Sequence, residues 1–135
     1  MERTYAADIK ESEGTVFLVR GWIHKIYDLG KLTFIQLRDK TGILQLVIDR
    51  KTEKGLRLET CIEAVGDKVI NEKAPMGVEL LVREIRVLGR VYYDTLPFEI
   101  NNHEIGASLE KQLDYRSISL RRHKTRAVFK VQEEI

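Results

Sequence analysis

The chain contains five segments in which apolar residues alternate with polar ones or cluster as they do in β-strands. Val, Ile, Leu and aromatic residues dominate these segments, and the short stretches between them carry the Gly, Pro or Asp that tight turns require. Tight turns are predicted at 28–30, 39–42 and 74–77, whereas the connection 50–60 is longer and polar and weakly favours a short helix around Leu56. The predicted strands span residues 16–27, 31–39, 43–49, 61–70 and 78–88.

The number of strands and the lengths of their connections together predict an all-β fold. Five strands joined by tight turns, with one longer crossover between the third and the fourth, are typical of the five-stranded Greek-key barrel called the OB-fold. The crossover is expected to hold the short helix between strands 3 and 4. The long first strand has to bend around such a barrel, and Gly21 lies where a bend is easiest because glycine has no Cβ to clash.

The character of the sequence changes after residue 89. Residues 90–112 contain Pro97 and a pair of asparagines without a sustained period, and we interpret them as a linker or hinge. Residues 113–135 are strongly basic, and their apolar residues recur at helical spacing, which predicts the start of a C-terminal helix. We therefore divide the chain into a barrel domain at 1–89, the linker, and the beginning of a truncated further domain. The apolar residues at helical spacing are Ala127, Val128, Val131 and Ile135.

Composition narrows the classes of protein to which the chain can belong. Its 135 residues, 43% of them apolar, suffice for one core, and 23 basic against 21 acidic residues give a net charge of +2, which by itself does not indicate nucleic-acid binding. The single Cys61 excludes an internal disulfide, lacks partners for a zinc site and is expected to be a buried thiol. Because the N-terminus lacks a signal sequence and no stretch approaches the roughly 20 apolar residues of a membrane span, we expect a soluble cytoplasmic protein without a metal.

Two positions on neighbouring predicted strands form the candidate functional surface. In the second strand, alternation sends Phe34, Gln36 and Arg38 to the face opposite its apolar residues, and in the third strand it turns Gln45 outward. OB-folds bind oligonucleotides on this face, where aromatic rings stack on bases and amide groups read base edges. Phe34 would be the stacking platform and Gln45 the reader. In the alternative interpretation Phe34 caps the core and Gln45 is a solvated strand residue, and spacing alone does not separate the two.

Motifs at both ends of the chain resemble one enzyme family. Three strings are similar to the opening of aspartyl-tRNA synthetases: GWIH at 21–24, DLGKLTFIQLRD at 28–39 and GILQ at 42–45. Three more resemble the segment that leads from hinge to catalytic domain in the same class II enzymes: LDYR at 113–116, LRR at 120–122 and AVFKVQ at 127–132. The resemblance covers nearly the whole chain and is to the N-terminal anticodon-binding domain of the archaeal-type enzyme.

The resemblance implies which residues read the anticodon. In that family the phenylalanine that matches Phe34 stacks on the central uridine, and the glutamine that matches Gln45 hydrogen-bonds that base. A glutamate of the fifth strand also takes part in the reading, and its best match is Glu79. Considered without the resemblance, Glu79 is a solvated strand charge.

The resemblance also implies backbone contacts and a specificity pair. Lys25 and Lys31 flank the Asp-Leu-Gly turn and are the expected tRNA backbone contacts, together with Tyr27, which stands where bacterial-type relatives have an arginine and could stack or hydrogen-bond instead. His24 and Pro75 stand at the positions that, in archaeal-type enzymes, hold Trp and Lys in forms strict for tRNA-Asp. We therefore expect a non-discriminating pocket. Without the resemblance, His24 is a solvated strand residue and Pro75 a turn former.

The activity of the whole enzyme follows from the same resemblance. The parent protein would be an aspartate-tRNA ligase that uses ATP and Mg²⁺ in a catalytic domain and forms a homodimer through that domain. The segment in hand offers no catalytic residue and no cofactor site, so it is expected to be inactive alone. Its partners would be the anticodon stem-loops of tRNA-Asp and tRNA-Asn. It is not expected to bind a membrane.

Two other functions stay open on the sequence. The equivalent domain of an asparaginyl-tRNA synthetase shares the barrel and much of the motif, although the Asp-Leu-Gly turn and the string LRR favour the aspartyl enzyme. A stand-alone OB-fold that binds single-stranded nucleic acid or another protein is the alternative of a different class, and the hinge and helix after the barrel argue against it. The basic run 121–126 is expected to dock on the catalytic domain and hinge rather than to bind nucleic acid freely.

Overall fold

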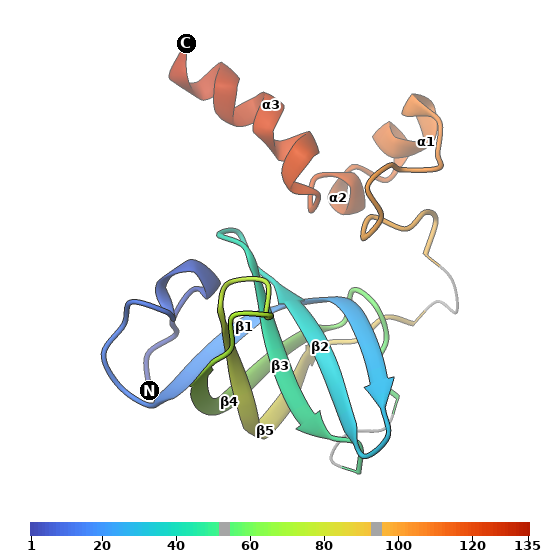
Figure 1. Ribbon diagram of the computed structural model, residues 1–135. Coiled ribbons are helices and arrows are strands. Elements are labelled where there is room, and N and C mark those ends of the chain that lie inside the picture. The colour runs from blue at the N-terminus through green and yellow to red at the C-terminus, as the bar shows by residue number, and fades with distance from the viewer. Residues whose placement is uncertain (52–54, 93–95) are drawn as a thin grey trace. The chain divides into compact units, whose positions relative to one another are not determined.

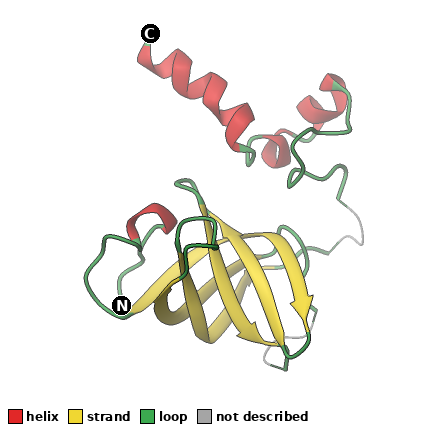
Figure 2. Cartoon of the chain, viewed as in Figure 1, coloured by secondary structure: helices red, strands yellow, loops and turns green. Residues whose placement is uncertain are grey.

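The computed structural model describes residues 1–51, 55–92 and 96–135, which form two compact units, Met1–Tyr92 and Tyr93–Ile135. In the first unit the described residues form five strands that close into a barrel in the order β1-β2-β3-β5-β4 (Figures 1 and 2). The predicted five-stranded barrel is thereby confirmed. The strands are β1 (Val16–Leu29), β2 (Leu32–Arg38), β3 (Ile43–Asp49), β4 (Cys61–Ile70) and β5 (Val78–Gly89).

The long strand β1 closes the barrel because it pairs with two neighbours. Its first half pairs with β4 and its second half with β2, both antiparallel, and Trp22 takes part in both pairings. At Gly21, just before this change of partner, a Cβ atom would overlap the backbone carbonyl oxygen of Arg38, so no other residue fits without a shift of the strands. The close approach of β2 therefore accounts for the glycine at this position, whereas the register shift of β1 lies between Ile23 and Lys25. Strand β3 pairs in parallel with β5, and the remaining strand pairs are antiparallel.

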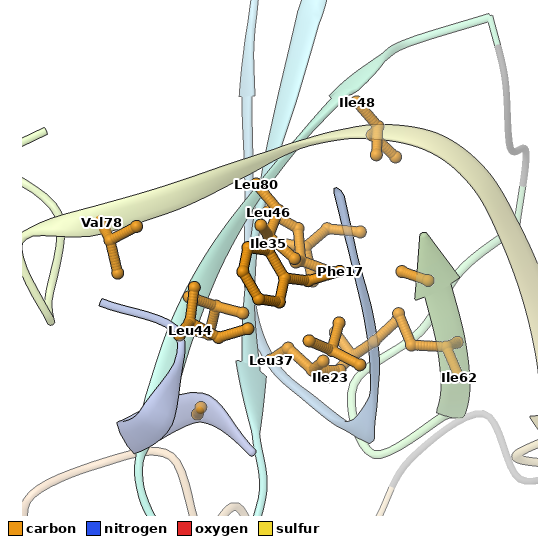
Figure 3. Close-up of a cluster of buried hydrophobic side chains, with 14 residues drawn as sticks. Phe17, Ile23, Ile35, Leu37, Leu44, Leu46, Ile48, Ile62, Val78 and Leu80 are labelled. Atoms are coloured by element: carbon orange, nitrogen blue, oxygen red, sulfur yellow. The ribbon is translucent and has the colours of Figure 1, made fainter. Parts of the chain in front are cut away.

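Alternation along the strands fills the barrel with apolar side chains (Figure 3). Ile35 and Leu37 of β2 and Leu44 and Leu46 of β3 are at most 2% exposed. The 3-10 helix η1 (Ala6–Asp8) also contributes to the core, because its Ala6 belongs to the buried cluster. The sequence pattern did not predict this helix. The other labelled core residues of Figure 3 are Phe17, Ile23, Ile48, Ile62, Val78 and Leu80.

The connection between β3 and β4 differs from the sequence prediction of a short helix. Among the described residues, 50–51 and 55–60 contain turns and irregular backbone and no helix, and residues 52–54 lie outside the described part. Gly55 has a φ of 88° and Glu59 a φ of 66°, and such left-handed backbone cannot continue a right-handed helix. Cys61, which the sequence analysis expected to be buried, is the first residue of β4 and is only half-buried.

Two carboxyl groups on β4 form ion pairs on the outside of the barrel. The hydrogen bond that Arg20 donates to Glu63, at 2.6 Å, holds the pKa of Glu63 below its ordinary value, and Arg86 adds Coulomb attraction. The hydrogen bonds from Arg83 lower the pKa of Asp67 in the same way. Because these pairs face water, they contribute little to stability.

The second unit is helical. It contains α1 (Leu109–Asp114), α2 (Arg116–Ser119) and α3 (His123–Glu134). The C-terminal helix predicted from apolar spacing is α3, whereas α1 begins inside the stretch 90–112 that the sequence assigns to a linker. Ser108 caps α1 by accepting a hydrogen bond from the backbone N–H of Lys111 at 3.2 Å, a signal that the linker interpretation overlooked. The three-part division of the chain stays a prediction.

Two classes of feature are absent from the described residues. None of the helices in the described part of the chain is long and apolar enough to cross a membrane. The same residues contain no group of three or more His, Cys, Asp or Glu side chains that could hold a metal ion.

Candidate nucleic-acid interface

Strand register arranges the outer surface of the barrel in rows of side chains. Residues paired across neighbouring strands project to the same side of the sheet. The first row therefore runs from Tyr27 on β1 through Phe34 on β2 and Val47 on β3 to Leu81 on β5. The second row, next to it, is polar and runs from Lys25 through Gln36 and Gln45 to Glu79.

Phe34 and Gln45 lie on this one outer surface, in adjacent rows. Gln45 pairs with Gln36, two residues from Phe34, so the two side chains are diagonal neighbours on adjacent strands, with backbones about 7 to 8 Å apart. A base stacked on the ring would lie within reach of the amide at that spacing. Register therefore places an aromatic ring and an amide together, as the candidate surface requires.

Phe34 lies outside the core. Among the described residues, neither the buried core cluster nor the partly buried side chains packed against it include Phe34. Its row neighbours Tyr27 and Leu81 are 45% and 43% exposed, and Val47 between Phe34 and Leu81 is covered although it faces outward. The interpretation in which Phe34 caps the core is disfavoured by this geometry.

Gln45 and Glu79 are joined by a hydrogen bond, and a third residue, Asn71, completes the cluster. Gln45 Nε2 donates to Glu79 Oε2 at 2.7 Å, and Asn71 Nδ2 donates to the same oxygen at 3.0 Å. Glu79 is only 9% exposed, although its register turns it outward. The sequence analysis did not identify Asn71. Its position directly after β4, at the start of the β4–β5 turn, was the only local indication that its side chain could reach this surface.

His24 lies at a β-bulge in β1 and contacts a buried ion pair. The pairing of β1 with β2 shifts register between Ile23 and Lys25. Arg38 Nη1 lies 2.9 Å from His24 Nδ1, and since a guanidinium only donates, Nδ1 accepts this hydrogen bond. Arg38 also donates to both carboxylate oxygens of Glu59, at 3.1 and 2.5 Å.

The burial of Arg38 corrects the sequence prediction that placed it on an exposed polar face with Phe34. Arg38 is 2% exposed and Glu59 4% exposed. The reason is the segment before β4, where the Glu59 N–H donates to the Ile23 carbonyl and the Ile23 N–H donates to the Thr60 carbonyl. This segment covers the end of β2, so the side chain of Arg38 faces outward and is nevertheless shielded from water.

Pro75 lies in the exposed β4–β5 turn, at the same end of the barrel as the β2–β3 turn (Figure 1). A Cβ on Gly42 would lie 3.3 Å from Met76, so the two turns are in contact. In the closed barrel β4 pairs with both β1 and β5, so a single strand separates β1 from β5 on that side. The two specificity candidates come from different elements, His24 from β1 and Pro75 from the β4–β5 turn.

The three expected backbone contacts border the aromatic row. Lys25 is half-buried and starts the polar row, and Tyr27 is paired with Phe34. Lys31 is exposed in the β1–β2 turn, where Gly30 has a φ of 64°, and its carbonyl accepts a hydrogen bond from the backbone N–H of Arg50. Two lysines beside an aromatic surface suit a phosphate backbone.

Comparison with known proteins gives a family and several relatives. The family model described as an OB-fold nucleic acid binding domain matches residues 17–88. The chain is 37% identical over 142 residues to an aspartate–tRNA(Asp/Asn) ligase of Archaeoglobus fulgidus, a match that covers 98% of this chain and 33% of the relative. The corresponding ligase of Methanococcus vannielii is 38% identical over 136 residues, covering 94% of this chain and 30% of the relative.

Solved structures agree with these matches in fold. Asparaginyl-tRNA synthetase from Pyrococcus horikoshii, complexed with asparaginyl-adenylate, superposes with a TM-score of 0.83 at 31% identity over 98% of this chain and 32% of that one. Aspartyl-tRNA synthetase from Entamoeba histolytica gives the same TM-score at 18% identity, over 98% and 35% of the two chains, and this likeness concerns the fold alone. The chain spans about a third of the length of the relatives that it matches.

Proposed function

The chain belongs to the OB-fold nucleic acid binding domain family, and from that premise we propose that it recognises the tRNA anticodon as the N-terminal domain of an aspartate-tRNA ligase. The observation that carries the proposal is the outer surface on which Phe34 lies outside the core, diagonal to Gln45. The curated relatives that match nearly the whole chain are aspartate–tRNA(Asp/Asn) ligases, which supports the same proposal.

Recognition would combine stacking with edge reading. The central base of the anticodon stacks on Phe34, a contact worth roughly 1 to 3 kcal/mol for one base. Gln45 hydrogen-bonds the edge of that base, and Glu79 supports the amide. Lys25, Lys31 and Tyr27 border the surface and contact the RNA backbone, where they fix the position of the loop without reading sequence.

The remaining two thirds of the parent enzyme would carry out aminoacylation. ATP and Mg²⁺ would be used in the catalytic domain. That domain would supply adenylate formation and the homodimer contact. The parent would aspartylate tRNA-Asp and tRNA-Asn in the cytoplasm, and this segment would not be an enzyme alone.

The anticodon-binding domain of an asparaginyl-tRNA synthetase is the second candidate, because one such enzyme superposes on the chain with 31% identity. The aspartyl assignment is preferred because the curated relatives that match 94% to 98% of the chain carry that name. Charging of each amino acid by the full-length parent separates the two. A stand-alone single-strand binder has less support, since these relatives are longer enzymes.

Binding of an anticodon stem-loop is expected to weaken steeply with salt, because each phosphate contact releases counterions from the RNA. For single-stranded RNA the slope of log affinity against log salt is about −0.7 for each contact. Fluorescence anisotropy in a sodium chloride series measures it. Lys25→Ala and Lys31→Ala should each remove one phosphate contact and so make the slope shallower by about 0.7.

Lys130→Ala is the matched control for this series, since Lys130 is exposed on α3, in the other unit. It should leave the slope unchanged. An affinity that does not depend on salt would rule out the proposed backbone contacts.

The pocket is expected to accept both pyrimidines at the third anticodon position, where tRNA-Asp has C and tRNA-Asn has U. The imidazole of His24 is smaller than a tryptophan ring, and Pro75 carries no charge where a lysine would, so the pair leaves room for either base. Stem-loops ending in C and U should therefore bind within about tenfold of each other, which is 1.4 kcal/mol.

The double variant His24→Trp, Pro75→Lys provides the comparison. It should shift binding toward the stem-loop with C at the third position. A wild-type preference above about tenfold would mean that the pocket discriminates and that the non-discriminating assignment is wrong.

A further inference from the structure

We propose that Glu79 and Asn71 are positioning residues that fix the amide of Gln45 in one orientation, so that the domain selects uridine over cytidine at the central anticodon position. The inference deepens the proposed function and rests on it. It assigns Glu79 a role behind the reading residue instead of on the base, and it gives Asn71 a role that neither the sequence motifs nor the relatives indicate.

The hydrogen bonds determine which end of the amide faces Glu79. A carboxylate offers only acceptors, so the group of Gln45 that lies 2.7 Å from Glu79 Oε2 has to be the Nε2 donor. The same holds for Asn71 Nδ2, 3.0 Å from that oxygen. Chemistry therefore settles the assignment of oxygen and nitrogen in both amides, and Gln45 Oε1 points away from the carboxylate.

Asn71 is itself held in place by two hydrogen bonds within the β4–β5 turn. Its backbone N–H donates to the Gly77 carbonyl at 3.1 Å, and its Oδ1 accepts from the backbone N–H of Lys73 at 3.1 Å. With Oδ1 engaged in the turn, Nδ2 is the atom left to meet Glu79. The parallel pairing of β3 with β5 sets Glu79 directly beside Gln45. Two rigid backbones thus define the position of the carboxylate, which is 9% exposed.

A fixed amide distinguishes the two pyrimidines because their edges are mirror images in hydrogen bonding. Uridine presents an N3–H donor beside the O4 acceptor, whereas cytidine presents an N3 acceptor beside the amine donor at C4. An amide that offers Oε1 and the second Nε2 hydrogen in a fixed order matches one edge and opposes the other. An amide free to rotate by 180° about its last bond would match both. Fixing Gln45 therefore converts a tolerant contact into a selective one.

The free protein allows a first test that needs no RNA. In ¹⁵N NMR spectra of the 135-residue chain, the Gln45 side-chain amide should be protected from hydrogen exchange relative to the amide of Gln36, its cross-strand neighbour. Glu79→Gln should remove that protection, because a glutamine at this position can offer oxygen or nitrogen to Gln45. If the Gln45 amide exchanges as fast as that of Gln36 in the unaltered chain, it is not anchored and the proposal is wrong.

Binding provides the second test, with stem-loops that differ only in U or C at the central anticodon position. The unaltered chain should prefer U by roughly tenfold or more, as a matched bidentate contact would give. Glu79→Gln should reduce the preference to within about threefold, through better binding of C. Asn71→Asp keeps the acceptor for Lys73 and loses the donor to Glu79, and it should lower the preference in the same direction by a smaller factor.

Glu63→Gln is the matched control, since it removes one carboxylate charge on β4 and leaves the cluster intact. It should change the affinities for U and C equally, and a purely structural role of Glu79 would also scale both affinities together. An unchanged preference in Glu79→Gln therefore overturns the positioning role. Should Phe34→Ala also leave binding unaffected, the proposed function fails with it, whereas loss of binding in Phe34→Ala would confine the failure to the positioning role.

Discussion

Replacing Glu59 by alanine is expected to lower the free energy of unfolding by about 3 to 5 kcal/mol, because it leaves the Arg38 guanidinium buried without its counterion. The two side chains are 3% and 2% exposed, and Arg38 donates to both carboxylate oxygens. Water cannot easily replace the lost acceptor at that depth. The expected loss is a large part of the total stability of a small domain.

Urea unfolding followed by circular dichroism measures this effect. Glu59→Gln, which keeps the shape and an acceptor but removes the charge, should lose less. In a double-mutant cycle with Arg38→Met, the double variant should lose less than the sum of the two single variants, since neither charge is then stranded. The exposed pair of Asp67 with Arg83 is the control, and Asp67→Ala should change stability only slightly. A loss below about 1 kcal/mol in Glu59→Ala would show that the guanidinium finds another partner.

The Glu59 variant should also affect the bulge at His24. Arg38 links the two residues, since it donates to both Glu59 and His24 Nδ1. Without Glu59 the guanidinium is free to move, and the imidazole loses the donor that orients it. The pair Arg38–Glu59 therefore couples the segment before β4 to a residue that we place on the tRNA surface.

Phe34→Ala is expected to weaken binding of the anticodon stem-loop by roughly 1 to 3 kcal/mol, or about 5- to 150-fold, while the barrel stays folded. The ring would be the stacking platform of the central base. It lies outside the core cluster, so its removal opens no cavity in the barrel interior. Anisotropy titrations give the affinity, and thermal unfolding gives the stability of the same variant.

Phe17→Ala is the matched comparison, because it removes the same ring from the core, where Phe17 is 6% exposed. It should cost about 3 to 5 kcal/mol in stability through the cavity it leaves. Phe34→Tyr, which keeps an aromatic face, should bind almost as well as the unaltered chain. A large drop in melting temperature for Phe34→Ala would mean that the ring supports the core, and the stacking role would then be wrong.

The pattern of apolar residues alone was enough to predict the barrel. Alternation in β2 and β3 assigns Ile35, Leu37, Leu44 and Leu46 to the interior, and the structure buries all four. The turn residues mark where strands end, and the largest difference in length is in β1, which continues to Leu29 instead of ending at 27. Local sequence succeeds here because a period of two and a turn are properties of neighbouring residues.

The helical unit was predicted less completely. In α3 the apolar residues Ala127, Val128 and Val131 recur at helical spacing, whereas α1 and α2 comprise six and four residues, too few for a period to appear. The cap at Ser108 was the available local signal for α1. The absence of a helix among the described residues 50–51 and 55–60 has a similar cause, since nothing in the local pattern indicates the left-handed backbone of Glu59.

The sequence by itself determined the strands, the inward residues and the outward direction of Phe34 and Gln45, because these depend on alternation within a strand. The tertiary structure decided what covers the outward residues. Arg38 and Glu59 are 21 residues apart in the chain, and Gln45 and Glu79 are 34 apart. Alternation cannot indicate that Arg38 is buried or that Gln45 has a fixed amide, since both depend on which distant segment the closed barrel brings alongside.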